Sequence, residues 1–245
     1  MKLDELVARL DSEATLPKGT EERFNGYGVI GITFRSGHVL ALRHFAASSV
    51  GPGYTSVWHR DPEGGWEFYA DAPAHLTCAR FFGSAVARAV QTPIHISWSN
   101  SCNFHVSVEA DALEWDVTLK STSTTNTINR LSRLLPETAW KEETLLKAFE
   151  QMAGNILNAG KLSLTGTTPN GQHFKAVPRS IEMVSDTKAS INGEDLGPAG
   201  PLDQQAHIGE FWIPQKGFFA VGQAYFEPFK PTLHHLITHI QTRLN

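Results

Sequence analysis

The side chains best suited to chemistry gather in residues 43–61, RHFAASSVGPGYTSVWHRD. Arg43 and Arg60 carry cations that can bind a carboxylate or a carbonyl oxygen. His44 and His59 titrate near neutral pH and can move a proton to or from a bound molecule. We therefore predict that the two histidines are catalytic and that the two arginines bind substrate.

Aromatic side chains accompany these charges. If residues 54–60 form a strand, Tyr54 and Trp58 lie on the same side as Arg60, whereas His59 lies on the other side. An aromatic wall with a few polar groups is typical of a small-molecule pocket, so Tyr54 and Trp58 join the predicted substrate-binding residues. The competing interpretation is that both aromatic residues fill the core and that Arg60 pairs with an acidic neighbour at the following turn.

His95 and His105 form a second candidate group. In a hairpin that pairs residues 94–98 with residues 104–108, the two histidines are diagonal neighbours on one face, within reach of a common small group or metal. We count both as substrate-binding residues. The alternative is that this face meets water, as one face of an antiparallel sheet usually does.

Recognised catalytic motifs are absent from the sequence. It contains no Walker loop, GxGxxG, HExxH, GxSxG, CxxC pair or EF-hand loop. His235 and His239 have metal-ligand spacing, but the apolar stripe of the expected last helix turns both of them outward. Cys78 and Cys102 fit small buried thiols better than a bridge. We expect neither a metal site nor a cofactor.

Composition excludes several classes of protein. The chain has 245 residues, of which 41% are hydrophobic and 19% charged, so one large core is expected. A net charge of −4 without a basic run argues against nucleic acid as a partner. Charges interrupt the first ten residues, and no apolar stretch is long enough to span a membrane, so we expect a cytoplasmic protein without membrane insertion. The expected partner is a hydrophobic small molecule, and a homo-oligomer is left open.

Alternating apolar residues predict a first block of β-hairpins. Ser36 and Gly37 form a two-residue turn in this prediction, which sets Ile32 opposite Ala41. Further strands are expected at 54–60, 66–70, 94–98, 104–108 and 113–121. Residues 75–91 fit either a strand followed by a short helix or a single helix throughout.

Two helices and a second block of strands follow. The stripe of Ile128, Leu131, Leu134 and Leu135 predicts one helix, and apolar residues from 145 to 157 predict another. In the second block, the pair Asn170-Gly171 is the strongest hairpin signal and sets Lys175 opposite Gly166. Residues 192–209 form either a lid or a crossing connection, and amphipathic helices are expected at 3–10 and 232–244.

These elements predict an α+β, β-rich fold. We expect a curved antiparallel sheet or barrel with helices inserted in the middle of the chain and at both termini. The whole chain, 1–245, is expected to form one domain, with hairpin blocks at 24–123 and 161–228 around a helical insert at 125–159. The arrangement resembles ligand-holding barrels such as lipocalins in architecture alone, because no diagnostic motif is shared.

The predicted function is that of a cofactor-independent enzyme of the lyase, hydratase or isomerase type. It acts on a hydrophobic small molecule in a β-rich cavity through histidine acid–base chemistry. The alternative is a non-catalytic binding barrel for an apolar metabolite or lipid. A third interpretation is a solidly packed scaffold in which Tyr54 and Trp58 are buried against the terminal helices. Histidines that converge in a cavity favour the enzyme, and a cavity without them favours the binding barrel.

Overall fold

The computed structural model describes residues 3–13, 15–136 and 139–235. The strands of its first half are β1 (Glu22–Val29), β2 (Ile32–Thr33), β3 (Val39–Ser48), β4 (Tyr54–Arg60), β5 (Trp66–Ala70), β6 (Arg88–Gln91), β7 (Ile94–Asn100), β8 (Asn103–Val108) and β9 (Leu113–Lys120). Those of its second half are β10 (Thr165–Thr167), β11 (His173–Ile191), β12 (Glu194–Asp195), β13 (His207–Ile208), β14 (Phe211–Trp212) and β15 (Phe218–Phe226). The helices are α1 (Leu3–Ser12), α2 (Ala79–Phe82), α3 (Ser123–Leu134) and α4 (Glu143–Leu157), together with four short 3₁₀ turns.

Strands from both halves of the chain form one curled sheet of 13 strands. Its order is β6-β5-β4-β3-β1-β15-β11-β9-β8-β7, with β2, β10 and β12 paired at the side of this path. The described strand pairs are antiparallel apart from β5 and β6, which are parallel. The β-rich, curved sheet predicted from the sequence is therefore confirmed, but its wholly antiparallel form is wrong, because the connection through α2 returns the chain in the same direction.

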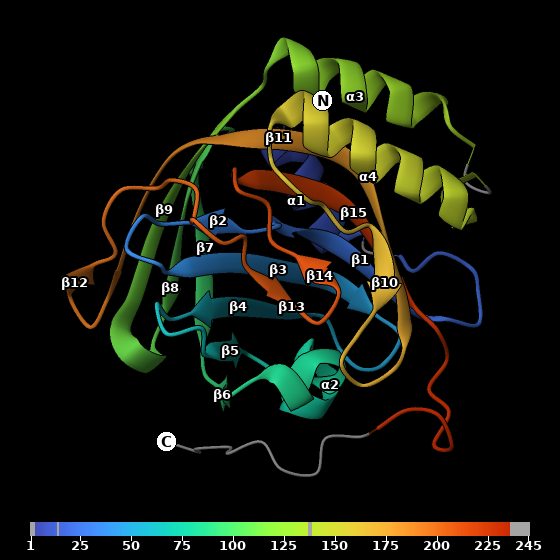
Figure 1. Cartoon of the computed structure of the whole chain (residues 1–245), viewed down its shortest axis with the longest axis horizontal. Coiled ribbons are helices and arrows are strands. Elements are labelled where there is room, and N and C mark those ends of the chain that lie inside the picture. Colours follow the sequence, from blue (N-terminus) through green and yellow to red (C-terminus); the bar gives the residue numbers. More distant parts are fainter. Residues whose placement is uncertain (1–2, 14, 137–138, 236–245) are drawn as a thin grey trace.

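The sheet curls until its two ends face each other in a half-barrel. Leu42 of β3 and Val57 of β4 share one apolar core with Val106 of β8 and Trp115 of β9, although these strands lie toward opposite ends of the sheet. Figure 1 shows β8 and β9 running across the direction of β3 and β4. This core fills the inner face of the half-barrel. The predicted N-terminal helix, α1, is confirmed and packs against it through Val7.

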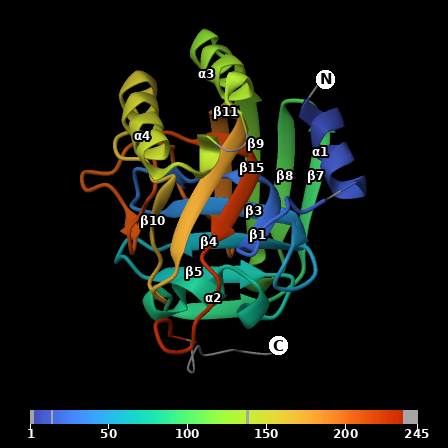
Figure 2. The same ribbon diagram turned by 90° about the vertical axis from the view of Figure 1, so that its right-hand side faces the viewer.

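The opposite, outer face of the sheet carries the other helices. α3 and α4 lie over β11 and β15, and α2 lies at the other end of the same face beside β4 and β5 (Figure 2). The two-stranded sheet β13-β14 packs against this face near α2. The outer face thus has a helical cover at each end, and β14 and the segment 162–164 lie over the middle of the sheet between them.

Glycines let the strands in the middle of the sheet approach closely. A Cβ added at Gly26 would overlap the carbonyl oxygen of His44, and one at Gly222 would overlap the carbonyl oxygen of Val177. The register between β1 and β3 also shifts at Gly26, which marks a β-bulge. Bulges and glycines are the usual means by which a sheet bends sharply.

The first predicted hairpin has its register wrong by one residue. Ile32 lies opposite Leu40, not Ala41. The connection consists of residues 35–37, because Phe34 N–H donates to the carbonyl of His38, and Gly37 adopts a φ of 100°. A three-residue loop of this kind needs a glycine in the left-handed region at its last position.

The Asn-Gly hairpin shows the same error for the same reason. Lys175 lies opposite Thr165, not Gly166. Its loop is residues 169–171, and Gly171 adopts a φ of 95°. The glycine ends a three-residue loop instead of completing a two-residue turn, and this moves the pairing by one position.

The hairpin of β7 and β8 is confirmed with its predicted register. Trp98 lies opposite Phe104, and Ile94 lies opposite Val108. The predicted strand at 113–121 is confirmed as β9, in which every second residue from Leu113 is buried. Strict alternation of apolar and polar residues was sufficient to predict the register and the buried face, because the other face of these strands is exposed to solvent.

Both predicted mid-chain helices are present, but the apolar stripe of the first is wrong. Leu131 and Leu134 are 45% and 79% exposed, whereas Asn129 is buried. The Asn129 side chain donates to the carbonyl of Ile181 at 3.0 Å and accepts from its N–H at 2.8 Å. α3 therefore packs a partly polar side against β11, because the N–H and the carbonyl of Ile181 in that bent strand need hydrogen-bond partners.

Three other predicted segments have the following structures. Residues 75–91 form neither predicted arrangement: a 3₁₀ turn and α2 precede β6. The long loop 192–209 crosses the end of β2, where the Thr33 hydroxyl donates to the carbonyl of Gly200 at 2.7 Å. The predicted helix at 232–244 lies mostly outside the described residues, as does His239. None of the described helices combines the length and the apolar character needed to cross a membrane.

Candidate functional site

A cavity of about 170 Å³ lies on the outer face of the sheet. Its floor consists of small residues on adjoining strands, where Gly26 pairs with Gly222 and Gly28 pairs with Ala220. Its cover comes from α4, from residues 162–164 and from β14, which lies in front of the sheet in Figure 1. The cavity thus lies between the small residues of the sheet and the segments that cover them.

The lining is apolar over most of its extent. Aromatic and aliphatic side chains from every surrounding element contribute, among them Phe45, Phe82, Phe149, Leu157, Phe174 and Phe218. The inner face of the half-barrel is instead filled by its own core. The cavity therefore lies on the outer face, which differs from the lipocalin-like arrangement with a cavity inside a barrel.

Arg43 is the one charged residue among the described residues that line the cavity. It is 8% exposed and lies over two aromatic rings, 4.7 Å from the centroid of Trp58 and 5.5 Å from that of Phe211. Burial lowers the pKa of Arg43 to about 10, so the side chain is still a cation near neutral pH. The cavity therefore has one positively charged end.

Cys78 and Tyr54 accompany Arg43 at this end. Cys78 lines the cavity, and its thiol lies 3.2 Å from the Tyr54 hydroxyl behind it. Burial raises the pKa of both groups above their ordinary values, although Arg43 opposes the shift in each case. Both are neutral hydrogen-bonding groups near pH 7, so the positive charge of Arg43 is not neutralised by them.

The four substrate-binding residues predicted in residues 43–61 do not all reach the cavity. Arg43 and Trp58 line it, and Tyr54 lies behind Cys78 on the same side of the sheet. Arg60 lies on the same side of β4 but at its end, where it donates to the carbonyl oxygens of Gly37 and Asp61. It supports the turn, as the competing interpretation held, although through main-chain oxygens.

The two predicted catalytic histidines point to the inner side. His44 lies 2.9 Å from the Thr55 hydroxyl and 3.0 Å from Asp11. His59 pairs with Leu40, an inner-core residue, and so also faces away from Arg43. The alternation predicted for residues 54–60 is confirmed, and this alternation places the sheet between the histidines and the cavity. A catalytic role for them stays a prediction.

His95 and His105 are the diagonal neighbours that the hairpin predicts, but they lie at the surface. The His95 side chain is 69% exposed, and His105 is 38% exposed between Glu114 and Asp116. Burial lowers the pKa of His105, but hydrogen bonds to the two carboxylates outweigh it and raise the pKa overall. Neither histidine lines the cavity.

His59 belongs instead to a polar cluster on the inner side. Its Nε2 lies 2.9 Å from Nδ1 of His38, and its Nδ1 lies 3.7 Å from Glu67, which Arg88 binds through two hydrogen bonds. His59 and then Arg88 hold the pKa of Glu67 well below its usual range, although burial opposes them. Among the described residues, no group of three or more potential ligands could hold a metal ion.

His38 gives this cluster a pH dependence. Its pKa is lowered, first by burial and then by His59, so the unfolded chain takes up a proton more readily than the folded protein. We expect the free energy of unfolding to fall as the pH drops through about 6.5 and on through the lower folded pKa. His38→Gln should flatten this part of the profile in urea unfolding measured at several pH values.

The exposed His95 supplies the control for this measurement. His95→Gln should leave the pH profile of the wild type unchanged, because its side chain is 69% exposed. His105, whose raised pKa acts in the opposite direction, is present in every variant and cancels in the comparison. A His38→Gln profile as steep as that of the wild type would contradict the assignment.

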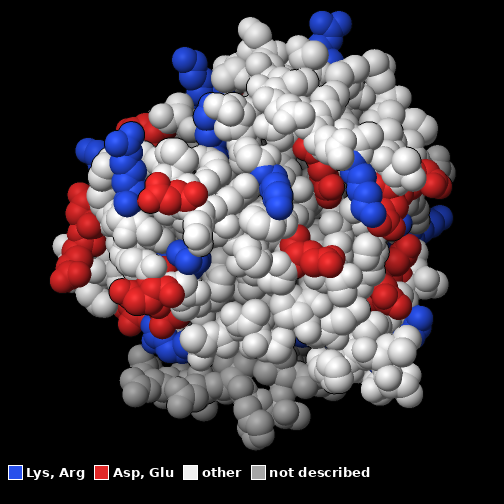
Figure 3. Space-filling view, viewed as in Figure 1, with Lys and Arg blue, Asp and Glu red and all other residues white. Residues whose placement is uncertain are grey.

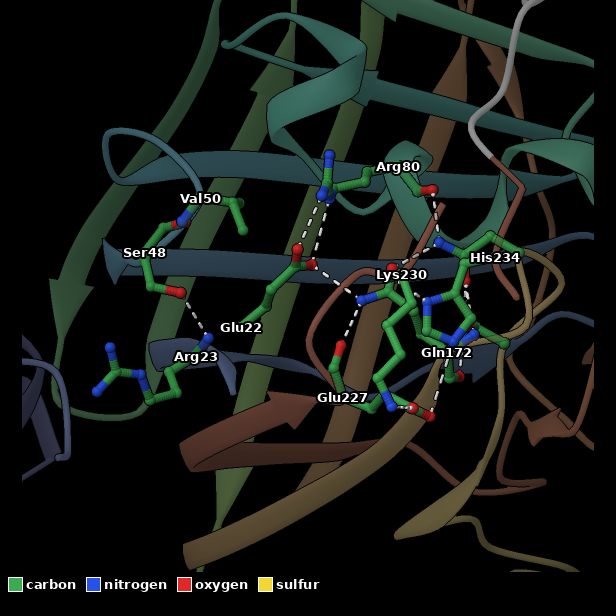
Figure 4. A network of polar contacts seen from close by, with 12 residues as sticks. Glu22, Arg23, Ser48, Val50, Arg80, Gln172, Glu227, Lys230 and His234 are labelled. Carbon is green, nitrogen blue, oxygen red and sulfur yellow. Dashed lines mark hydrogen bonds and ion pairs between the residues drawn. The ribbon is translucent and has the colours of Figure 1, made fainter. Parts of the chain in front are cut away.

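A second polar network joins α2 to the sheet (Figure 4). Glu22 accepts hydrogen bonds from Arg80 at 2.7 and 3.2 Å and from Gln172 at 3.1 Å. Gln172 also donates to the carbonyl of Glu227, so the network reaches the segment after β15. These charged and amide groups are matched donor to acceptor, which indicates a structural role in anchoring α2, the helix that carries Phe82 into the cavity lining.

The surface that covers the cavity carries charges of both signs. Figure 3 shows acidic and basic side chains scattered over this face, with uncharged surface between them. No continuous basic or acidic area is visible on it. Charge on this face therefore offers no basis for an extended binding surface, and the buried charge of Arg43 is the distinctive electrostatic feature of the site.

Several lining residues were not predicted from the sequence. Gly26, Gly28 and Gly222 carry a usable signal, because glycine inside a strand marks a close approach of main chains or of a ligand. Cys78 was interpreted as a small buried thiol, which it is, but without a place in the site. Phe149 comes from α4, and nothing in its local sequence separates a cavity residue from a core residue.

Comparison with known proteins assigns no family to this chain. No family model matches the sequence, and no curated protein matches it. The fold is similar to the solved structure of acetoacetate decarboxylase from Legionella pneumophila, over 94% of this chain and 95% of that chain, with 10% identity and a TM-score of 0.39. With so low a similarity, the function has to be argued from the site alone.

Proposed function

We propose that the protein binds an apolar small molecule in the cavity on the outer face of its sheet. The observation that supports this most directly is the cavity itself: about 170 Å³ lined almost wholly by apolar side chains over a floor of glycine and alanine. An apolar void of this size costs a protein several kcal/mol in lost packing, and a bound apolar molecule offsets that cost. Of the functions predicted from the sequence, the binding protein for an apolar metabolite or lipid fits this site best.

A cofactor-independent enzyme is the second candidate. It is favoured by the Tyr54–Cys78 hydrogen bond beside Arg43, since a hydroxyl and a thiol can exchange a proton and a cation can stabilise an anion. A lyase, hydratase or isomerase that works through this group would not need His44 or His59. Mass spectrometry of the incubated ligand distinguishes the candidates, because an enzyme yields a product and a binding protein returns the ligand unchanged.

Filling part of the cavity with a larger side chain should weaken binding. Ala224 lines the cavity beside Ala176, its partner on β11, so the larger side chain of Ala224→Leu has to enter the space. In calorimetric titration with decanol, a neutral apolar probe, we expect the wild type to bind and Ala224→Leu to bind at least about 10-fold more weakly.

The matched control is Ala47→Leu. Ala47 lies on β3 of the same sheet, is partly exposed and does not line the cavity, so this variant should bind decanol as the wild type does. Two results would overturn the proposed function: a wild type that binds neither decanol nor decanoate, or an Ala224→Leu variant that binds decanol with unchanged affinity while remaining folded.

A further inference from the structure

We propose that the cavity is specific for a monocarboxylic acid, whose carboxylate accepts hydrogen bonds from Arg43 and Trp58 and whose apolar body fills the remaining space. This inference rests on the proposed function, because it names the chemical class of the molecule that the cavity binds. The observation behind it is that the charged end of the cavity has more hydrogen-bond donors than acceptors to pair with them.

Arg43 has unused donors. Its Nη1 donates to the carbonyl oxygens of Val29 at 2.6 Å and Leu42 at 2.8 Å, and its Nη2 donates to that of Ile30 at 3.0 Å. A guanidinium has five N–H groups, so Nε and one N–H of Nη2 are left without a partner in these contacts. No described carboxylate forms an ion pair with it, and Arg43 is 8% exposed. A buried cation held only by dipoles and aromatic rings is incompletely compensated.

Two further buried groups lie beside it with incomplete hydrogen bonding. The hydroxyl of Ser56 has no partner among the described residues, and the indole N–H of Trp58 has only a weak interaction with the thiol of Cys78, whose pKa it lowers slightly against the effect of burial. Both residues are almost fully buried. Ser56 pairs directly with Arg43, and Trp58 pairs with Ala41 two positions along β3, so all these side chains emerge on the same face. Unpartnered buried donors are rare in folded proteins and often mark the place of a ligand.

The chemistry of these groups selects the ligand. A carboxylate has only acceptors and one negative charge, which matches several donors around a single cation. An alcohol would leave the charge of Arg43 unpaired, and an amine would add a second positive charge. A phosphate monoester carries about two negative charges, whereas Arg43 is the one charged residue of the described lining. The apolar remainder of the lining then accommodates a hydrocarbon or aromatic body.

The experiment compares octanoate, decanoate and dodecanoate with the corresponding alcohols by calorimetric titration at about pH 8, where the acids are ionised. We expect the best acid to bind the wild type at least about 10-fold more tightly than its alcohol. Arg43→Met should weaken binding of that acid at least about 30-fold, the loss typical when one partner of a buried charge pair is removed. Binding of the alcohol should change by less than about threefold.

If Arg43→Met does not fold, the variant Trp58→Phe still tests the inference. Trp58→Phe keeps an aromatic ring but removes the indole N–H, so it should weaken the acid about 10-fold and the alcohol far less, as expected for a hydrogen bond to a charged group. Trp66→Phe is the control, because Trp66 is buried on β5 and does not line the cavity.

The outcomes separate the inference from the proposed function. Two results would overturn the inferred preference for a carboxylate but not the proposed binding function. One is equal affinity of the wild type for acid and alcohol, and the other is an acid affinity that Trp58→Phe leaves unchanged. A wild type that binds neither series would overturn the proposed function itself. Selective loss of the acid in Trp58→Phe, with Trp66→Phe unchanged, supports the carboxylate site.

Discussion

Gly26→Ala is expected to lower the free energy of unfolding by at least about 3 kcal/mol, at the upper end of the cost of overpacking. The added Cβ would overlap the carbonyl oxygen of His44 and also approach the Cα of Phe45. Both obstacles are main chain of the neighbouring strand, so rotation of a side chain cannot relieve the overlap. The strands β1 and β3 would have to separate at the bulge where their register shifts. Urea unfolding monitored by tryptophan fluorescence measures the change.

Gly19→Ala is the matched control for this prediction. Its added Cβ would meet the carboxylate of Glu21, which is the far end of a flexible side chain and not main chain, and Gly19 itself is exposed, so the change should stay within about 0.5 kcal/mol of the wild type. If Gly26→Ala unfolds at the same urea concentration as Gly19→Ala, the close approach of β1 and β3 is not a requirement of the fold. The glycine floor of the cavity would then need another explanation.

Glu22→Ala is expected to cost about 3 kcal/mol, because it leaves a largely buried cation without its anion. The Glu22 and Arg80 side chains are 14% and 17% exposed, and two hydrogen bonds join them. Figure 4 shows that Glu22 also accepts from Gln172, which loses this acceptor in the same variant. Since Arg80 belongs to α2, loosening of the network should also disturb Phe82 in the cavity lining.

The exposed pair of α1 provides the comparison. Glu13 and Arg9 lie 3.0 Å apart, but their side chains are 65% and 66% exposed, so Glu13→Ala should change the free energy of unfolding by no more than about 0.5 kcal/mol. Thermal and urea unfolding of both variants test the difference. Equal and small losses would show that the Glu22–Arg80 contact contributes no more than a surface ion pair, and that burial does not set its strength.

The site and the pH-dependent cluster lie on opposite faces of the same strands. Arg43 and Trp58 point outward from β3 and β4 to the cavity, whereas His44 and His59 point inward from the same strands. One sheet thus separates the positively charged end of the cavity from the polar cluster that contains His38. Protonation of His38 should therefore act on stability, whereas Arg43 is a cation on both sides of pH 7 and keeps the site positively charged.

Predictions from the sequence were most accurate where a property depends on neighbours in the chain. The register of β7 and β8 and the buried side of β9 are confirmed, because residues at period two must share a face. The registers of the hairpins at Gly37 and Gly171 were wrong by one position. A glycine allows a left-handed conformation in a loop, but it does not show whether the loop has two residues or three. The stripe of α3 was wrong because a bent strand elsewhere needed hydrogen-bond partners.

What the sequence determined by itself was most of the strands, their alternation, and the placement of Tyr54, Trp58 and Arg60 on one side of β4. What only the tertiary structure decided was which side holds a cavity. Periodicity shows that two residues share a face, but not what covers that face. The cover comes from α4 and β14, more than eighty positions away in the chain. The histidines were separated from Arg43 for the same reason: neighbours along a strand point to opposite sides, and only packing between distant segments makes one side a core and the other a binding site.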